Sequence, residues 1–97
     1  MTSIFIIADL MDVVLEIHRR TGLGGDMRWY AGFRGAYEKQ GGLAAGVVGN
    51  GATPWAALRD YARRIAGKPM MFDLFSEGHR RDFLMPLDLG VPDGEIS

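Results

Sequence analysis

The first apolar segment of the chain follows a helical spacing. Residues 4–20 begin with the run Ile4–Ile7 and continue with four apolar residues at positions i, i+3, i+4 and i+7, namely Leu10, Val13, Val14 and Ile17. Acidic residues come early in this segment and basic residues come late, an order that suits the helix dipole. The pattern predicts a helix that ends at residues 21–25, with Gly22 as a left-handed cap. The run Ile4–Ile7 is compatible with an extension of this helix or with a short strand.

Alternating residues predict two strands after this helix. Over residues 27–35, one face of the predicted strand is apolar and the other places a tyrosine between two arginines. The apolar face consists of Trp29, Ala31 and Phe33, and the polar face consists of Arg28, Tyr30 and Arg34. Residues 43–48 form a second, weaker strand, and residues 36–42 can extend both strands toward a hairpin turn. Strands this close in sequence pair antiparallel by default.

The clearest helix boundaries lie in the second half of the chain. Thr53 is a good N-cap and Pro54 a good first residue, because proline has no amide donor to leave unpaired. The predicted helix runs to about Ala66, where Gly67 caps it and Pro69 prevents its continuation. Its apolar face consists of Leu58, Tyr61, Ala62 and Ile65.

The last third of the chain predicts two more strands and a tail. Residues 70–75 and 81–87 are the strands, residues 76–79 are the turn between them, and residues 88–97 form a mobile acidic tail. The element order is then α-β-β-α-β-β, which predicts an α+β fold with an antiparallel sheet of about four strands and two helices. We expect one domain over residues 1–97, comprising a helical segment over 1–25, a ββαββ core over 27–87 and the tail. The expected core residues are Trp29, Phe33, Leu58, Tyr61, Ile65 and Phe72.

Composition narrows the class of protein. The chain has 97 residues, of which 47% are hydrophobic and 24% charged, and it has no cysteine. These values are typical of one small globular domain and exclude a disulfide scaffold. The apolar start is too short and too charged to span a bilayer, and it lacks the basic region of a signal peptide. We therefore expect no membrane partner.

The sequence has no strong catalytic or metal-binding motif. It contains two histidines, whereas a metal site needs three or four preset ligands. His79 lies near Ser76, Glu77 and Asp82, but a glycine-containing turn does not fix the geometry that a catalytic triad needs. Residues 49–54 lead into a helix N-terminus that could bind a phosphate, yet they lack the Lys-Ser/Thr ending of a P-loop. A structural turn is the favoured interpretation, and we expect no enzyme activity, no metal and no cofactor.

Basic residues are concentrated in the middle of the chain. Residues 18–81 hold all eleven Lys and Arg residues but only five of the twelve acidic ones, although the formal net charge is −1. Arginine beside aromatic residues is typical of protein hot spots and of nucleic-acid-binding faces. A solvated charged surface is the alternative interpretation. The candidate partner-binding residues are Arg28, Tyr30, Arg34, Arg63, Arg64, Arg80 and Arg81.

Several blocks, in order, resemble a family of small phage-encoded proteins. The blocks are Trp29-Tyr-Ala-Gly-Phe-Arg34, Glu38-Lys39, Gly49-Asn-Gly-Ala-Thr-Pro54 and Asp60-Tyr-Ala-Arg-Arg-Ile-Ala-Gly-Lys68, followed by two apolar strands. The resemblance covers about residues 28–86. It departs from the family where Trp55 and Ala56 replace two glutamates after Thr-Pro, which removes the capping-box carboxylate.

The resemblance implies a phage origin and the cytoplasm of a bacterial host. Small phage proteins of this class often inhibit host defence. We therefore expect a non-catalytic protein that binds and inhibits a host defence complex, specifically an anti-CRISPR protein that acts on a CRISPR-Cas complex. The alternative is a small nucleic-acid-binding module that uses the same arginines on phosphate.

Overall fold

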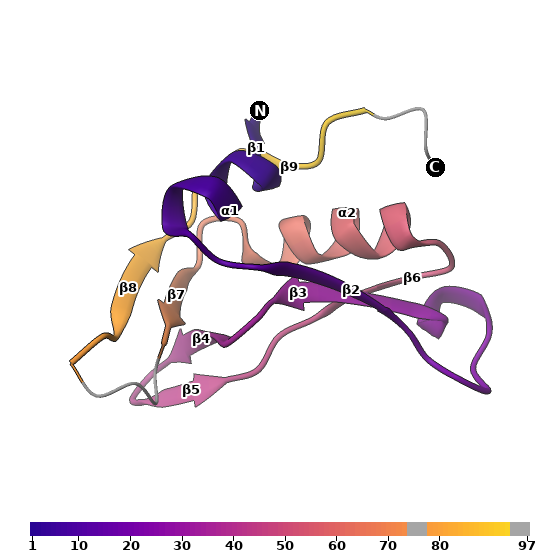
Figure 1. Cartoon of the computed structure of the whole chain (residues 1–97), viewed down its shortest axis with the longest axis horizontal. Helices are drawn as coiled ribbons and strands as arrows, with labels where there is room; N and C mark the ends of the chain where they lie inside the picture. Colours follow the sequence, from indigo (N-terminus) through magenta and orange to yellow (C-terminus); the bar gives the residue numbers. More distant parts are fainter. Residues whose placement is uncertain (74–77, 94–97) are drawn as a thin grey trace.

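The computed structural model describes residues 1–73 and 78–93. Two α-helices, a short 3-10 helix and a set of short strands make up this part of the chain (Figure 1). The elements are β1 (Thr2–Ser3), α1 (Ile4–Met11), β2 (Leu15–Arg19), η1 (Gly25–Met27), β3 (Trp29–Phe33), β4 (Ala36–Gln40), β5 (Leu43–Ala45), β6 (Gly49–Gly51), α2 (Pro54–Ile65), β7 (Pro69–Phe72), β8 (Arg81–Leu84) and β9 (Leu89–Gly90).

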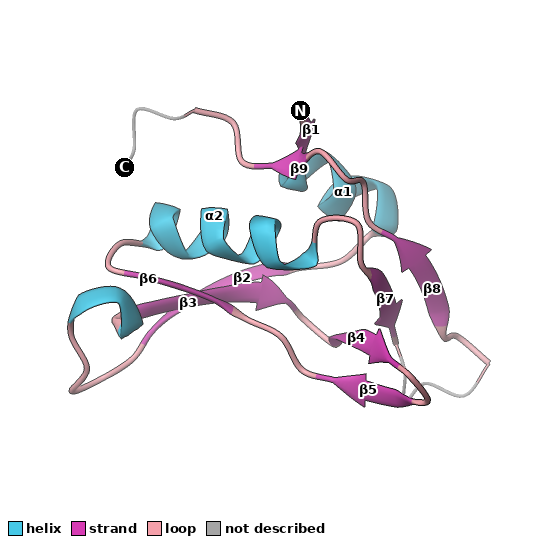
Figure 2. Cartoon of the chain, turned by 180° about the vertical axis from the view of Figure 1, so that it is seen from behind, coloured by secondary structure: helices cyan, strands magenta, loops and turns pink. Residues whose placement is uncertain are grey.

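The strands form separate sheets. One sheet has the order β2-β3-β6 and another the order β5-β4-β7-β8, and all pairs within these two are antiparallel. Strands β3 and β4 follow each other with Arg34 and Gly35 between them, and the left-handed backbone of Gly35 (φ 70°) lets the chain pass from one sheet to the other. Helix α2 lies along one side of the β2-β3-β6 sheet (Figure 2). The predicted α+β class is confirmed, although the expected single sheet is divided.

The predicted helix over residues 4–20 is only half correct. Helix α1 begins after Ser3, whose side chain accepts a hydrogen bond from the Phe5 amide at 3.2 Å, and it ends at Met11. Asp12 adopts a left-handed conformation (φ 53°) that stops the helix. The following residues pair with β3 instead, because β-branched side chains favour a strand where a partner strand is available.

The region after β2 also differs from its prediction. Gly22 is left-handed (φ 81°), as predicted, but it lies in the connection between β2 and β3 rather than at a helix end. The strand predicted over 43–48 shrinks to β5 and pairs with β4, not with β3. The strand that borders β3 on its second edge is β6, in a segment predicted to be a turn.

Close approach between α2 and β6 explains why that segment is rich in glycine. A Cβ atom on Gly49 would lie 2.1 Å from the Tyr61 amide nitrogen, and one on Gly51 would lie 2.4 Å from the Ala57 amide nitrogen. Both clashes involve helix backbone, so the helix can rest on β6 only where no side chain intervenes. The glycines are therefore required because this strand packs directly against helix backbone.

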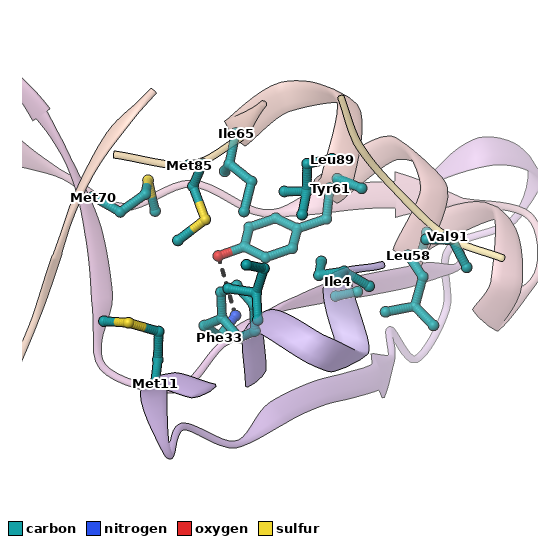
Figure 3. Packing of buried hydrophobic residues seen from close by; sticks show 14 of the residues in the cluster. Ile4, Met11, Phe33, Leu58, Tyr61, Ile65, Met70, Met85, Leu89 and Val91 are labelled. Atoms are coloured by element: carbon teal, nitrogen blue, oxygen red, sulfur yellow. Dashed lines mark hydrogen bonds between the residues drawn. The ribbon is translucent and has the colours of Figure 1, made fainter. Parts of the chain in front are cut away.

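Helix α2 and the core agree with the prediction. The Thr53 hydroxyl accepts a hydrogen bond from the Ala56 amide at 3.0 Å, and Gly67 is left-handed (φ 71°) just beyond the helix. Tyr61 is 1% exposed and lies at the centre of the buried cluster (Figure 3). The expected core residues Phe33, Leu58, Tyr61, Ile65 and Phe72 are buried, and Trp29 is partly buried against them.

The C-terminal segment is more ordered than predicted. Strand β9 pairs with β1 in parallel, and Leu89 and Val91 are buried in the core, so this segment is held to the fold and is not a tail. Thr2 donates to the Asp88 carboxylate at 2.8 Å and fixes this closure. Strands β7 and β8 confirm most of the predicted final hairpin. The predictions for residues 74–77 and 94–97 lie outside the described residues.

Candidate functional site

The β2–β3 pair presents a polar outer face, on the side away from α2. In the strand register, His18 is opposite Tyr30 and Glu16 is opposite Gly32. The Arg20 amide donates to the Arg28 carbonyl at 2.8 Å, which continues the register beyond the strand ends. We call this surface the hairpin face. Its residues are Glu16, His18, Arg20, Arg28, Tyr30 and Arg34.

An aromatic and cationic stack occupies the centre of the hairpin face. The rings of His18 and Tyr30 are stacked, with centroids 5.1 Å apart and planes at 25°. The Arg20 guanidinium carbon lies 4.6 Å from the Tyr30 ring centroid, within cation–π range. Arg20 also donates to the Met27 carbonyl at 3.0 Å, so its side chain is held over the ring. These contacts preorganise the three side chains before any partner arrives.

One end of the hairpin face is electrically compensated. Arg34 donates through Nε at 3.1 Å and through Nη2 at 3.0 Å to the same Glu16 oxygen, and His18 Nε2 lies 3.6 Å from that oxygen. Beside this pair lies a cavity of about 270 Å³ that Tyr30, Gly32 and Val47 help to line. A Cβ atom on Gly32 would lie 3.5 Å from the Val47 carbonyl oxygen and 3.7 Å from the Tyr61 ring, so the glycine lets these two groups approach the strand.

The other end of the hairpin face carries uncompensated charge. Within residues 1–73 and 78–93, no carboxylate forms an ion pair with Arg20 or Arg28. Arg28 is exposed at the end of η1. An unpaired guanidinium next to a stacked ring is suited to bind a carboxylate or a phosphate of another molecule.

Arg63 and Arg64 lie elsewhere, in the last turn of α2, which covers the opposite face of the sheet. Both donate to the Asp60 carboxylate, Arg64 Nε at 2.8 Å. The Asn50 amide donates to the same carboxylate at 2.8 Å. Burial raises the pKa of Asp60, but the hydrogen bonds from Asn50, Arg64 and Arg63 outweigh it, and the net pKa is lowered. Asp60 therefore joins α2 to β6, and the two arginines support its carboxylate from within the helix.

Arg80 and Arg81 form a third, separate group at the start of β8. Arg80 binds Asp82 through two hydrogen bonds of 2.9 and 3.2 Å. The hydrogen bond from Arg80 is the main reason that the pKa of Asp82 is lowered. Arg81 donates to Asp73 at 3.1 Å and to the Met11 carbonyl, so it ties β8 to the end of α1. The predicted residues thus fall into three groups, and only Arg28, Tyr30 and Arg34 share a face.

Sequence reasoning missed Glu16, His18 and Arg20, because it assigned them to a helix. Their signal is a period of two: they alternate with Leu15, Ile17 and Arg19, as strand residues do. The same six residues also fit a helical spacing, so the pattern was ambiguous without the partner strand.

The other candidate sites gain no support. In the described ranges, no group of three or more His, Cys, Asp or Glu side chains could hold a metal ion. The Asn50 amide binds Asp60 and the Ala56 amide binds Thr53, so the start of α2 directs these donors inward rather than toward a phosphate. His79 is exposed, and two residues of its proposed triad, Ser76 and Glu77, lie outside the described residues.

Comparisons with protein-family models, with curated proteins and with solved structures found no match to this chain. The resemblance to small phage-encoded proteins therefore stays a prediction, and the hairpin face is interpreted from its own geometry. Neither helix in residues 1–73 and 78–93 is long and apolar enough to cross a membrane.

Proposed function

We propose that this protein works by binding a macromolecular partner through the hairpin face, without catalysing a reaction. The observation that supports this is the His18–Tyr30–Arg20 stack beside Arg28, which has no carboxylate partner among the described residues. Binding energy in protein interfaces is concentrated in a few aromatic and arginine residues held in fixed positions. Tyr30 and Arg20 have this arrangement before a partner binds.

The partner we propose is an acidic surface on a protein of a host defence complex. The free arginines at the Arg28 end would bind carboxylates, and Tyr30 would supply apolar contact area. The resemblance to small phage-encoded proteins supports the choice of a host defence complex, and an anti-CRISPR activity in the cytoplasm of a bacterial host is the specific form of the proposal. Arg63, Arg64, Arg80 and Arg81 are assigned to stability rather than to binding, since each is paired with a carboxylate.

A nucleic-acid partner is the second candidate, and the same stack supports it. Planar rings and guanidinium groups on an open strand surface can stack on unpaired bases, and free arginines can bind phosphates. Such binding weakens steeply as salt concentration rises, because phosphate binding releases counterions. Fluorescence anisotropy with single-stranded DNA and RNA in a salt series distinguishes the two candidates.

The test compares variants of the hairpin face with a matched variant elsewhere. Tyr30→Ala and Arg28→Glu should each reduce affinity at least thirtyfold, about 2 kcal/mol. Arg59→Glu is the control, because Arg59 is an exposed arginine on α2 with no ion pair to a described residue. The assay is phage plaque formation on a host with active CRISPR-Cas immunity and on the same host without it. Unchanged inhibition by folded Tyr30→Ala and Arg28→Glu variants would exclude the hairpin face as the binding surface.

A further inference from the structure

Strand β2 has an open edge. It is the outermost strand of the β2-β3-β6 sheet, and no strand of the described residues lies beyond it. Its residues 17–19 are exposed, and Ile17 retains 38% of its accessible surface, a large value for an isoleucine in a strand. An open, partly apolar edge can accept another strand through backbone hydrogen bonds.

The hydrogen-bond pattern shows which backbone groups face this open edge. The Arg20 amide donates to the Arg28 carbonyl and the Arg34 amide donates to the Val14 carbonyl, both at 2.8 Å. Residues with even numbers in β2 therefore bond to β3, because antiparallel pairs alternate between bonded and non-bonded positions. The amide and carbonyl groups of Leu15, Ile17 and Arg19 consequently point away from β3.

We infer that β2 pairs with β2 of a second copy of this chain, antiparallel and centred on Ile17. In this register the bonding positions coincide, with Ile17 opposite the partner's Ile17 and Leu15 opposite the partner's Arg19. On the outer face, Glu16 lies opposite the partner's His18. The twofold axis repeats this contact, so a carboxylate meets an imidazole on both sides of the centre.

Neighbouring registers are less favourable. A shift of one residue toward the N-terminus places Glu16 opposite the partner's Glu16, and like charges directly opposite are destabilising. A shift of one residue toward the C-terminus places Ile17 opposite the partner's Arg19, so the contact between the two Ile17 side chains is lost. The register centred on Ile17 alone pairs every residue of Leu15–Arg19, places unlike groups opposite each other and covers the exposed isoleucine.

Charged side chains on an edge often serve to prevent such pairing. On β2, however, Glu16 and His18 flank the central Ile17. Twofold pairing therefore places each Glu16 opposite the partner's His18, and no two like charges face each other. The pairing would join the two sheets into one and place two hairpin faces side by side. This inference stands without the proposed function, since it depends on the edge of β2 and not on the identity of another partner.

Amide hydrogen exchange of the wild-type chain tests the inference directly. Across a protein concentration series, NMR should show the Leu15, Ile17 and Arg19 amides gaining protection as concentration rises. The Glu16 and His18 amides, already bonded to β3, should be protected throughout. Sedimentation velocity should show dimers over the same range. Fast exchange of the Ile17 amide at every concentration, or a monomer throughout, would overturn the inference.

Variants identify the edge as the cause of association. Ile17→Pro removes an amide that faces outward, so it costs no bond to β3 and should abolish the dimer while the circular dichroism spectrum is retained. A dimer that persists in folded Ile17→Pro would mean that another surface is responsible.

A charge exchange then tests the register. Glu16→Lys and His18→Glu should each weaken self-association about tenfold or more. Mixed together, the two variants should associate with each other, since the new ammonium then faces the new carboxylate. Equal association of both single variants and the wild type would overturn the proposed register.

Discussion

Replacing Tyr61 by phenylalanine removes one oxygen atom from the centre of the core. The Tyr61 hydroxyl accepts a hydrogen bond from the Phe33 amide at 3.1 Å, on the edge of β3 that β6 no longer covers (Figure 3). Without the hydroxyl, a buried backbone donor has no partner. The expected cost is about 1–3 kcal/mol of unfolding free energy at neutral pH.

The same variant has a signature at high pH. Burial raises the pKa of Tyr61 to about 12, from 10.0 for an unburied tyrosine, although the Phe33 amide lowers it in part. The unfolded chain therefore loses this proton first as pH rises. Stability that Tyr61 contributes below about pH 10 is lost between about pH 10 and 12, on the order of 3 kcal/mol. The Tyr61→Phe variant has no phenolic proton, so it does not lose stability in this way.

Urea unfolding followed by circular dichroism, at a series of pH values, measures both effects. Tyr30→Phe is the matched control, because the Tyr30 hydroxyl has no hydrogen bond to the described residues and the ring is only half-buried. The difference between wild type and Tyr61→Phe should shrink as pH rises above 10, whereas Tyr30→Phe should follow the wild type. A neutral-pH change below about 0.5 kcal/mol, the range of an ordinary surface substitution, would refute this account of the core.

Two further predictions concern the packing of α2 on β6. Gly49→Ala should lower the unfolding free energy by about 1–3 kcal/mol or more, because its Cβ would lie 2.1 Å from the Tyr61 amide nitrogen. Gly46→Ala is the control: its Cβ would have no atom within 4 Å, so stability in the same melts should change by less than about 0.5 kcal/mol. Asp60→Asn should cost about 1–3 kcal/mol at neutral pH, since it weakens a charged acceptor of the Asn50 amide. Folding lowers the pKa of Asp60, so the stability that its carboxylate contributes is lost as pH falls below about 4. The difference in unfolding free energy between Asp60→Asn and the wild type should therefore vanish in acid. A difference independent of pH would contradict this account of the Asp60 carboxylate.

The elements predicted correctly are those whose signals are local. Helix α2 has a capping threonine, a proline at its first position and a glycine after its last turn, and each of these acts on the adjacent backbone. Its buried face follows from the spacing of Leu58, Tyr61 and Ile65, which fits one side of a helix and no strand.

The errors arose where distant segments decide the structure. Residues 13–19 carry a spacing that fits a helix, and only the availability of β3 as a partner makes them a strand. Gly49–Gly51 was predicted to be a turn, because nothing in its own sequence reveals that a helix will rest on it. The first error also affected the candidate site. Tyr30 and its flanking arginines were predicted from the alternation along β3. His18 and Arg20, which complete the stack, come from the β2 segment that was predicted to be a helix.

The parallel pairing of β1 with β9 has a consequence for synthesis on the ribosome. Thr2 leaves the ribosome well before its partner Leu89, which is translated 87 residues later. Ile4 and Ile7 are buried in a cluster that includes Leu89 and Val91, so their side chains stay uncovered until the segment that contains Leu89 has been made. The order of translation thus makes closure a late event, and the N-terminal segment is the part of the nascent chain that a chaperone would bind meanwhile.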